Sequence, residues 1–162
     1  MMQISRLPDR LLASPPARSR RGAVLAVVAL LGLAGCSEQP EVIKIGVGQP
    51  LSGPLAALGQ DMVNGTKMAV DEINARGGVR IGSTRVKLEL VSADDKSDVE
   101  AGKAAARTLV DAGGTVAIAH LNSGVSIGSA KTYADAGIPQ LAISTNPTYT
   151  RQDVPTTLRL VA

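Results

Sequence analysis

Predicted strands and predicted helices alternate along residues 42–161, and this alternation restricts the fold more than any other feature of the chain. Short segments with period-two alternation or a continuous apolar run indicate strands, at 42–48, 85–91, 115–119, 140–143 and 157–161. Apolar residues at helical spacing lie between the first four, at about 56–76, 98–112 and 123–136. Strands joined by helices form a parallel sheet with right-handed crossovers. We therefore predict an α/β fold, a doubly wound and mostly parallel sheet with helices on both faces.

Three local features refine this prediction. Asp98 has the position and chemistry of a helix N-cap. Gly102 lies within the helix that follows, where glycine costs about 1 kcal/mol relative to alanine, and we expect it to let that helix lie close to the sheet. The strand 115–119 is almost entirely apolar, which is typical of a sheet covered on both faces.

The segment before this domain has the composition of a secretory signal peptide. An arginine-rich stretch at 18–21 precedes about a dozen apolar or small residues at 23–34, the order of a signal peptide. This apolar run is shorter than the about 20 residues that a membrane-spanning helix needs. The Ser-Arg-Arg at 19–21 also leaves export through the twin-arginine route open.

The only cysteine, Cys36, directly follows Leu-Ala-Gly at 33–35. This arrangement resembles the bacterial lipobox, in which the cysteine receives a diacylglycerol, the signal is cut, and the new amino terminus is acylated. We predict a lipoprotein-type signal peptide at 1–35, lipidation of Cys36, a linker at 36–41 and one domain at 42–162. An ordinary signal peptide with an incidental cysteine is the alternative.

The charge balance excludes nucleic acid as a partner. The whole chain has 17 basic and 14 acidic residues, but 1–35 holds five of the arginines and one of the acids. The remainder has 12 basic and 13 acidic residues and is close to neutral. A neutral domain has no electrostatic attraction for phosphates, and two tyrosines as the only aromatic residues cannot build a base-stacking platform.

Ligands of doubly wound sheets bind beyond the carboxyl ends of the strands. This rule selects four loops, at 49–58, 92–98, 120–124 and 144–147. The third leads into a helix N-terminus, whose free N–H groups and dipole suit a carboxylate or phosphate. Ser123 and Thr145 could add hydroxyl groups there. The alternative is that both side chains only cap their loops.

Other site chemistries have weak support. The pattern Gly46-x-Gly48 lacks the third glycine of a dinucleotide fingerprint, so we predict no cofactor. Ser123 is three positions from His120 in a turn and not on a nucleophile elbow, so a catalytic triad is not indicated. We expect His120 to be satisfied by the backbone. The acids at 94, 95 and 98 are interpreted as solvated dipole and capping residues, with no metal site.

Several strings, taken together and in order, resemble branched-chain amino acid ABC-transporter substrate-binding proteins. They are IKIGV at 43–47, PLSGP at 50–54, AVDEINARGGV at 69–79, DD at 94–95, HLNSG at 120–124, YADAGIP at 133–139 and TNP at 145–147. The resemblance implies the type I periplasmic-binding fold, in which two α/β lobes joined by a hinge close on a ligand. Residues 42–162 correspond to the first lobe only, and we expect the second lobe to be absent from this chain.

The resemblance also implies roles for individual residues. Ser123 corresponds to the serine that holds the amino acid headgroup of the ligand. Ile143, Ser144 and Thr145 correspond to a second headgroup clamp, although the segment before Thr145 is one residue shorter than is usual in the family. Leu58 occupies a position that lines the pocket.

The function implied is that of an extracytoplasmic solute-binding lipoprotein on the periplasmic side of a bacterial membrane. It captures a small amino acid, of the branched-chain class, and presents it to an ABC permease. A sensory or regulatory binding protein of the same fold is the alternative. An enzyme is not expected, because the sequence holds no nucleophile–base pair. As a one-lobed fragment, the chain is expected to bind leucine weakly or not at all.

Overall fold

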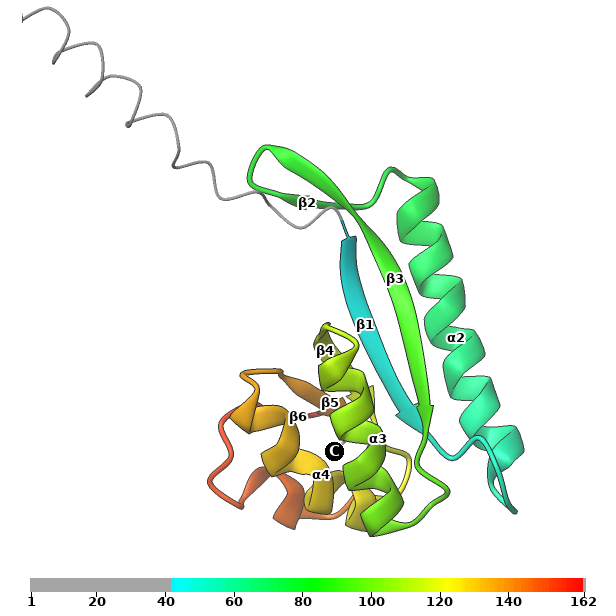
Figure 1. The fold of residues 1–162 in the computed structure, drawn as a ribbon, viewed down its shortest axis with the longest axis vertical. Helices are drawn as coiled ribbons and strands as arrows, with labels where there is room; N and C mark the ends of the chain where they lie inside the picture. The colour runs from blue at the N-terminus through cyan, green and yellow to red at the C-terminus, as the bar shows by residue number, and fades with distance from the viewer. Residues whose placement is uncertain (1–41, 162) are drawn as a thin grey trace, which may run out of the picture. The chain divides into compact units, whose positions relative to one another are not determined.

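The computed structural model describes residues 42–161, which form a six-stranded sheet with helices on both sides (Figure 1). The predicted signal peptide at 1–35, the lipidated Cys36 and the linker lie outside the described residues, so those predictions stay predictions. None of the helices in the described part is long and apolar enough to cross a membrane.

The sheet is built around its first strand. β1 pairs in parallel with β3 on one side and β4 on the other, β5 and β6 extend the parallel sheet beyond β4, and β2 pairs antiparallel with β3. The strands are β1 (Val42–Gln49), β2 (Val79–Ile81), β3 (Thr84–Asp94), β4 (Gly114–Ala119), β5 (Gln140–Ala142) and β6 (Thr157–Arg159). The predicted doubly wound, mostly parallel sheet is therefore confirmed.

Two elements were not predicted. β2 has only three residues and forms a tight hairpin with β3 through Gly82, whose φ of +58° suits a residue without a Cβ. A 3-10 helix, η1 (Pro147–Thr150), lies between the segments predicted as strands at 140–143 and 157–161. Both are short, and β2 has no buried residue, so neither shows a clear hydrophobic period in the sequence.

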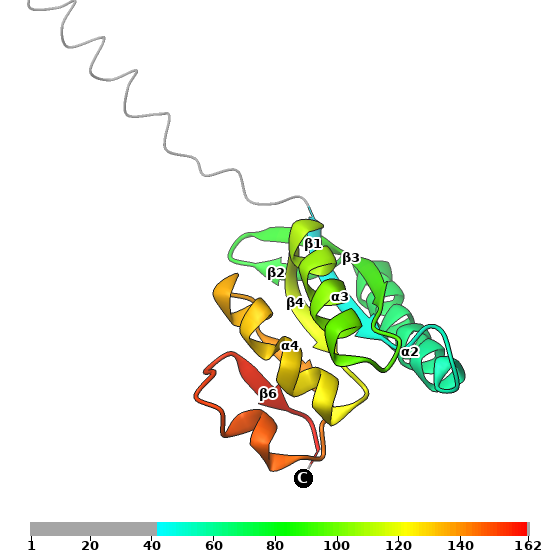
Figure 2. The same ribbon diagram turned by 60° about the horizontal axis from the view of Figure 1, so that its bottom comes forward.

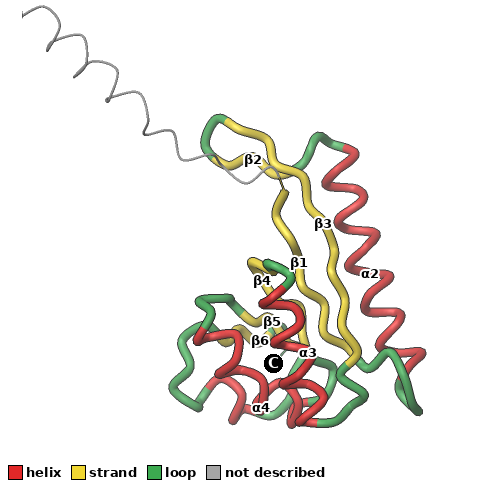
Figure 3. Tube along the Cα trace, viewed as in Figure 1, coloured by secondary structure: helices red, strands yellow, loops and turns green. Residues whose placement is uncertain are grey.

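The three helices lie on opposite faces of the sheet (Figures 2 and 3). α2 (Ala56–Ala75) contacts β1 and β3 on one face, whereas α3 (Val99–Asp111) and α4 (Ser123–Asp135) cover the other. Gly77 and Gly78, both with positive φ, follow the C-cap residue Arg76 of α2, and a Cβ on Gly78 would lie 2.2 Å from the carbonyl oxygen of Val86. The helix predicted at about 56–76 is therefore confirmed.

Glycines bring α3 and α4 into close contact. A Cβ on Gly102 of α3 would lie 2.2 Å from Cγ1 of Val125 in α4, and one on Gly128 of α4 would lie 2.6 Å from Cγ1 of Val99 in α3. A valine side chain of the facing helix thus occupies the space beside each glycine. Gly102 was expected to allow a close approach to the sheet, but the close approach it allows is to α4.

The sheet is covered unevenly within residues 42–161. On the α3 side, small residues such as Ala117 and Ala119 pack with Leu109 in the core. On the other side, α2 reaches only part of the sheet, and an apolar groove of about 220 Å³ separates it from Val116, Ile118 and Leu141. The expectation that the strand at 115–119 is covered on both faces is therefore met only in part by the described residues.

The Gly102–Val125 contact predicts opposite effects for two glycine-to-alanine substitutions. Gly102→Ala should lower the free energy of unfolding by about 1–2 kcal/mol, because overpacking against a stiff valine outweighs the gain in helix propensity. Gly65→Ala should raise it by about 0.5–1 kcal/mol, because a Cβ there meets no atom within 4 Å among the described residues. Urea denaturation measures both, and a stabilised Gly102→Ala variant would contradict the packing.

Candidate functional site

The carboxyl ends of the parallel strands form one edge of the sheet, and the predicted site residues lie in the loops at this edge. Gln49 at the end of β1 pairs with Asp94 at the end of β3, and Gly48 pairs with Ala119 at the end of β4. The three strands therefore end side by side, which brings the loops that follow them together.

Asp94 organises the loop after β1. Its Oδ1 accepts hydrogen bonds from the backbone N–H groups of Leu51, at 2.8 Å, and Lys96, at 2.9 Å, and its Oδ2 accepts one from Ser52 Oγ at 2.6 Å. Desolvation alone would raise the pKa of Asp94, but the hydrogen bonds from Ser52, Lys96 and Leu51 together outweigh it and hold that pKa below its usual value.

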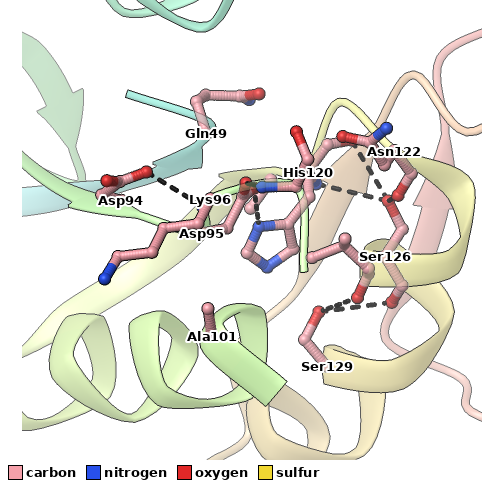
Figure 4. A network of polar contacts seen from close by, with 12 residues as sticks. Gln49, Asp94, Asp95, Lys96, Ala101, His120, Asn122, Ser126 and Ser129 are labelled. Atoms are coloured by element: carbon pink, nitrogen blue, oxygen red, sulfur yellow. Dashed lines mark hydrogen bonds and ion pairs between the residues drawn. The ribbon is translucent and has the colours of Figure 1, made fainter. Parts of the chain in front are cut away.

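Asp95 forms a buried pair with His120. Its Oδ2 lies 2.7 Å from His120 Nδ1, both side chains are fully buried, and the Asp95 Oδ1 accepts from the Ser97 N–H at 2.8 Å. Because a carboxylate can only accept, Nδ1 carries the hydrogen of this bond. Figure 4 shows the Asp95 carboxylate directed at the His120 ring, while Asp94 is turned away from it.

Tyr133 of α4 lies on the other side of the imidazole, with its hydroxyl oxygen 3.4 Å from His120 Nε2. Burial, with a smaller contribution from the charge of Asp95, raises the pKa of Tyr133 above its usual value. The phenol therefore stays protonated, and its O–H can donate a hydrogen bond to Nε2. The three side chains form one buried polar chain that joins the ends of β3 and β4 to α4.

These contacts correct two expectations. His120 was expected to be satisfied by the backbone, but its ring is held by the Asp95 carboxylate. Asp94 and Asp95 were interpreted as solvated dipole residues, but Asp95 is fully buried and Asp94 holds a neighbouring loop. Asp98 does cap α3, as predicted, by accepting from the Ala101 N–H at 2.8 Å.

Ser126 of α4 holds the turn that follows His120. Its Oγ lies 3.1 Å from the carbonyl oxygens of both His120 and Asn122, to either of which it can donate, and it accepts from the His120 N–H at 3.4 Å (Figure 4). A Cβ on Gly48 would lie 2.7 Å from His120 Cε1, so only glycine fits beneath the ring. Contacts with β1, the end of β3 and α4 therefore fix the position of this turn.

Ser123 begins α4, directly after this turn. The N-cap residue Asn122 makes no side-chain cap hydrogen bond within the described part of the chain, which leaves the first N–H groups of α4 without that partner. The Ser123 Oγ accepts from the Asn146 N–H at 3.3 Å, so the loop with Thr145 lies beside it. The structure thus brings Ser123 and the segment next to Thr145 together, as predicted.

The other predicted site residues lie in different environments. Leu58 is 53% exposed on the first turns of α2. Ile143 is half-buried after β5, and Ser144 is fully buried, with an Oγ that has no hydrogen-bond partner among residues 42–161. The ligand contacts assigned to Leu58, Ser123, Ile143, Ser144 and Thr145 stay predictions.

Buried polar residues that sequence reasoning missed support the same edge. Gln140 donates from Nε2 to the Ala119 carbonyl at 3.0 Å, and Gln49 donates to the Ile118 carbonyl at 3.3 Å. Gln140 was placed in the predicted strand 140–143 and Gln49 in the predicted loop 49–58, and neither position by itself marks a buried polar side chain. Over residues 42–161, no group of three or more His, Cys, Asp or Glu side chains is placed to hold a metal ion.

Comparison with known proteins identifies the family. Residues 42–158 match the family model described as periplasmic binding protein. The chain belongs to the periplasmic binding protein family. Its lobe is that of the type I periplasmic-binding fold, as the sequence predicts, and membership of the family implies a periplasmic location.

Curated relatives of this periplasmic binding protein include amino acid-binding proteins. The Leu/Ile/Val-binding protein homolog 2 of Brucella abortus is 37% identical over 136 residues, which are 83% of this chain and 35% of the relative. The Leu/Ile/Val-binding protein BraC3 of Rhizobium johnstonii is 37% identical over 118 residues, 72% of this chain and 31% of the relative. The chain thus spans about a third of the length of these relatives.

Solved structures show the same lobe. The branched-chain amino acid transporter substrate binding protein LivJ of Streptococcus pneumoniae, in complex with isoleucine, matches with a TM-score of 0.66 and 29% identity, over 73% of this chain and 33% of that one. An ABC transporter substrate-binding protein of Desulfitobacterium hafniense, in complex with Leu, matches with a TM-score of 0.61 and 36% identity, over 74% and 34%.

The lowered pKa of Asp94 predicts a pH-dependent stability difference. The stability that Asp94 adds is fully present above the pKa of 3.8 that its carboxyl has in the unfolded chain. It is lost as the pH falls through the lower pKa of the folded state. Asp94→Asn should therefore cost about 1 kcal/mol at pH 7, a figure reduced for partial exposure, and less at pH 3. Urea denaturation at both pH values measures this. Ser52→Ala should show a smaller loss with the same trend, and a pH-independent loss would contradict the assignment.

Proposed function

We propose that this chain is the first lobe of an extracytoplasmic solute-binding protein of an ABC importer. In this proposal a small amino acid of the branched-chain class is captured between two lobes and delivered to a membrane permease. The observation that carries the proposal is the N-terminus of α4, which has no side-chain cap among residues 42–161 and has Ser123 and the loop at 145–146 beside it. The relatives named for binding leucine, isoleucine and valine support the ligand class.

The chemistry of this edge suits an amino acid headgroup. The first N–H groups of α4 and its dipole favour an α-carboxylate, and the Ser123 hydroxyl can donate a further hydrogen bond. Carbonyl and hydroxyl oxygens of 143–145 are acceptors for an ammonium group, which has only donors. Leu58, 53% exposed on α2, offers an apolar surface for an aliphatic side chain.

The fold alone does not select an amino acid. A solute binding protein of Rhodopseudomonas palustris, solved in complex with 3,4-dihydroxy benzoic acid, shares this fold with a TM-score of 0.61 at 21% identity. The neighbours solved with isoleucine and Leu are more similar in sequence, at 29% and 36%. We therefore favour an aliphatic amino acid and use the aromatic acid as a comparison ligand.

A lipid anchor at Cys36 is part of the same proposal. The cysteine follows Leu-Ala-Gly after an apolar run, the arrangement that resembles a lipobox. Each buried methylene adds about 0.8 kcal/mol of membrane affinity, and stable anchoring takes more than one acyl chain. A diacylglycerol with an acylated amino terminus meets that requirement.

The headgroup assignment predicts weak, localised leucine binding by this chain. A micromolar binding protein has about 8 kcal/mol of binding free energy, and a lobe that supplies about half of it binds at about millimolar Kd. We expect L-leucine to shift the NMR amide signals of 122–126 and 143–146 saturably. Ser123→Ala should weaken binding about tenfold, the loss of a hydrogen bond to a charged group.

The control for this titration is Ser83→Ala, in the β2–β3 turn outside the loops of the candidate site. It should leave leucine binding unchanged. An equal loss of leucine binding in both variants would contradict the proposed site. Saturable shifts only with 3,4-dihydroxybenzoate would contradict the proposed ligand.

The anchor predicts where the protein fractionates. The wild-type chain should be recovered with bacterial membranes, and Cys36→Ser should move it to the soluble periplasmic fraction, because no acyl chain can then be attached. Ser37→Ala is the matched control and should stay with the membranes. If Cys36→Ser distributes as the wild type does, the lipidation hypothesis is wrong.

A further inference from the structure

Two adjacent carboxylates at the end of β3 contact different neighbouring loops. Asp94 accepts hydrogen bonds from Leu51 and Ser52 in the loop after β1, and Asp95 binds His120 in the loop after β4. Asp94 is the last residue of β3 and Asp95 follows it, and in Figure 4 the two carboxylates point apart. One dipeptide therefore connects the loops on both sides of the β3 end.

The contacts of Asp94 affect the position of the helix turn that carries Leu58. The loop after β1 folds back tightly on α2, since a Cβ on Gly59 would lie 1.9 Å from the carbonyl oxygen of Pro50. The Gly59 N–H also donates to the Leu55 carbonyl at 3.0 Å. A shift of Leu51 away from Asp94 would therefore move Pro50 and, with it, the first turns of α2.

The contacts of Asp95 affect the position of the turn that precedes Ser123. The His120 ring lies against Gly48 between Asp95 and Tyr133, and the backbone of His120 is bonded to Ser126. The Ser126 N–H in turn donates to the Asn122 carbonyl at 2.9 Å. These bonds fix the position of the turn before Ser123 relative to the sheet.

We propose that Asp94 and Asp95 are positioning residues for ligand capture, with Asp94 placing Leu58 and Asp95, through His120, placing Ser123. This inference rests on the proposed function of the same edge. It assigns two properties of the site, the affinity for the headgroup and the preference among side chains, to two neighbouring residues. Asp95 determines the affinity for the headgroup common to all amino acids, and Asp94 determines the preference among their side chains.

The first test needs no ligand. Asp94→Asn, Asp95→Asn and the control Asp98→Asn are compared by amide hydrogen exchange in the whole chain. Asp95→Asn should speed exchange of the hydrogen-bonded N–H groups of His120 and Ser126 at least tenfold and leave those of Leu51, Ala56 and Gly59 unchanged, and Asp94→Asn should do the reverse. Asp98→Asn keeps a side-chain oxygen that can accept from the Ala101 N–H, so it should change exchange in neither loop. Equal acceleration of both loops in both variants, or of neither loop, would overturn the proposal.

The second test measures dissociation constants for L-leucine and L-alanine by NMR titration. Asp95→Asn should weaken both ligands by the same factor, about tenfold, whereas Asp94→Asn should lower the preference for leucine over alanine about threefold. A purely structural role would change both variants' affinities in proportion to their stabilities, and that result would overturn the proposal. Absence of leucine binding in the wild-type chain would contradict the proposed function, while the exchange data would still judge the positioning roles.

A conservative pair at His120 keeps the test decisive if Asp95→Asn does not fold. The side-chain amide nitrogen of His120→Asn takes the place of Nδ1 and can still donate to Asp95, whereas His120→Leu cannot. Slow exchange of the Ser126 N–H and leucine affinity should be retained in His120→Asn and lost in His120→Leu. Equal behaviour of the two variants would overturn the role of the Asp95–His120 bond.

Discussion

The parallel pairing of β1 with both β3 and β4 is the constraint on which the rest of the structure depends. It ends the three strands side by side, with Gln49 beside Asp94 and Gly48 beside Ala119. Parallel strands need long crossover connections, so every one of these ends is followed by a loop at the same edge. The loops can then bond to one another through Asp94, Asp95 and His120, and Ser123 follows directly on this bonded turn.

Close approach of the elements depends on residues without side chains. The His120 ring occupies the space beside Gly48, and Val125 of α4 occupies the space beside Gly102 of α3. Protein interiors are packed as densely as organic crystals, so a methyl group at either position would displace its neighbour. The buried Asp95–His120 pair is possible because this packing excludes water while Ser97 and Tyr133 satisfy its remaining polar atoms.

Sequence reasoning predicted the architecture well and the site only in outline. The three helices and the longer strands were predicted because each is long enough to show its hydrophobic period. β5 and β6, of three residues each, were predicted only within the longer segments 140–143 and 157–161, whereas β2 and η1, of three and four residues, were missed. The edge of the sheet, Ser123 and the neighbouring loop were identified from strand order and helix polarity. The roles of Asp94, Asp95 and His120 were misjudged, because neighbours along the chain do not show which partner each carboxylate meets.

The sequence by itself determined the α/β class, the order of its strands and helices, the family and the edge that carries the candidate site. These properties follow from local periodicity and from motifs, which a chain carries before it folds. Only the tertiary structure decided that Asp95 is buried against His120, that Asp94 holds the loop after β1, and that Gly102 faces α4. Asp95 and His120 are 25 residues apart, and such contacts are set by strand register and helix packing, which join distant segments.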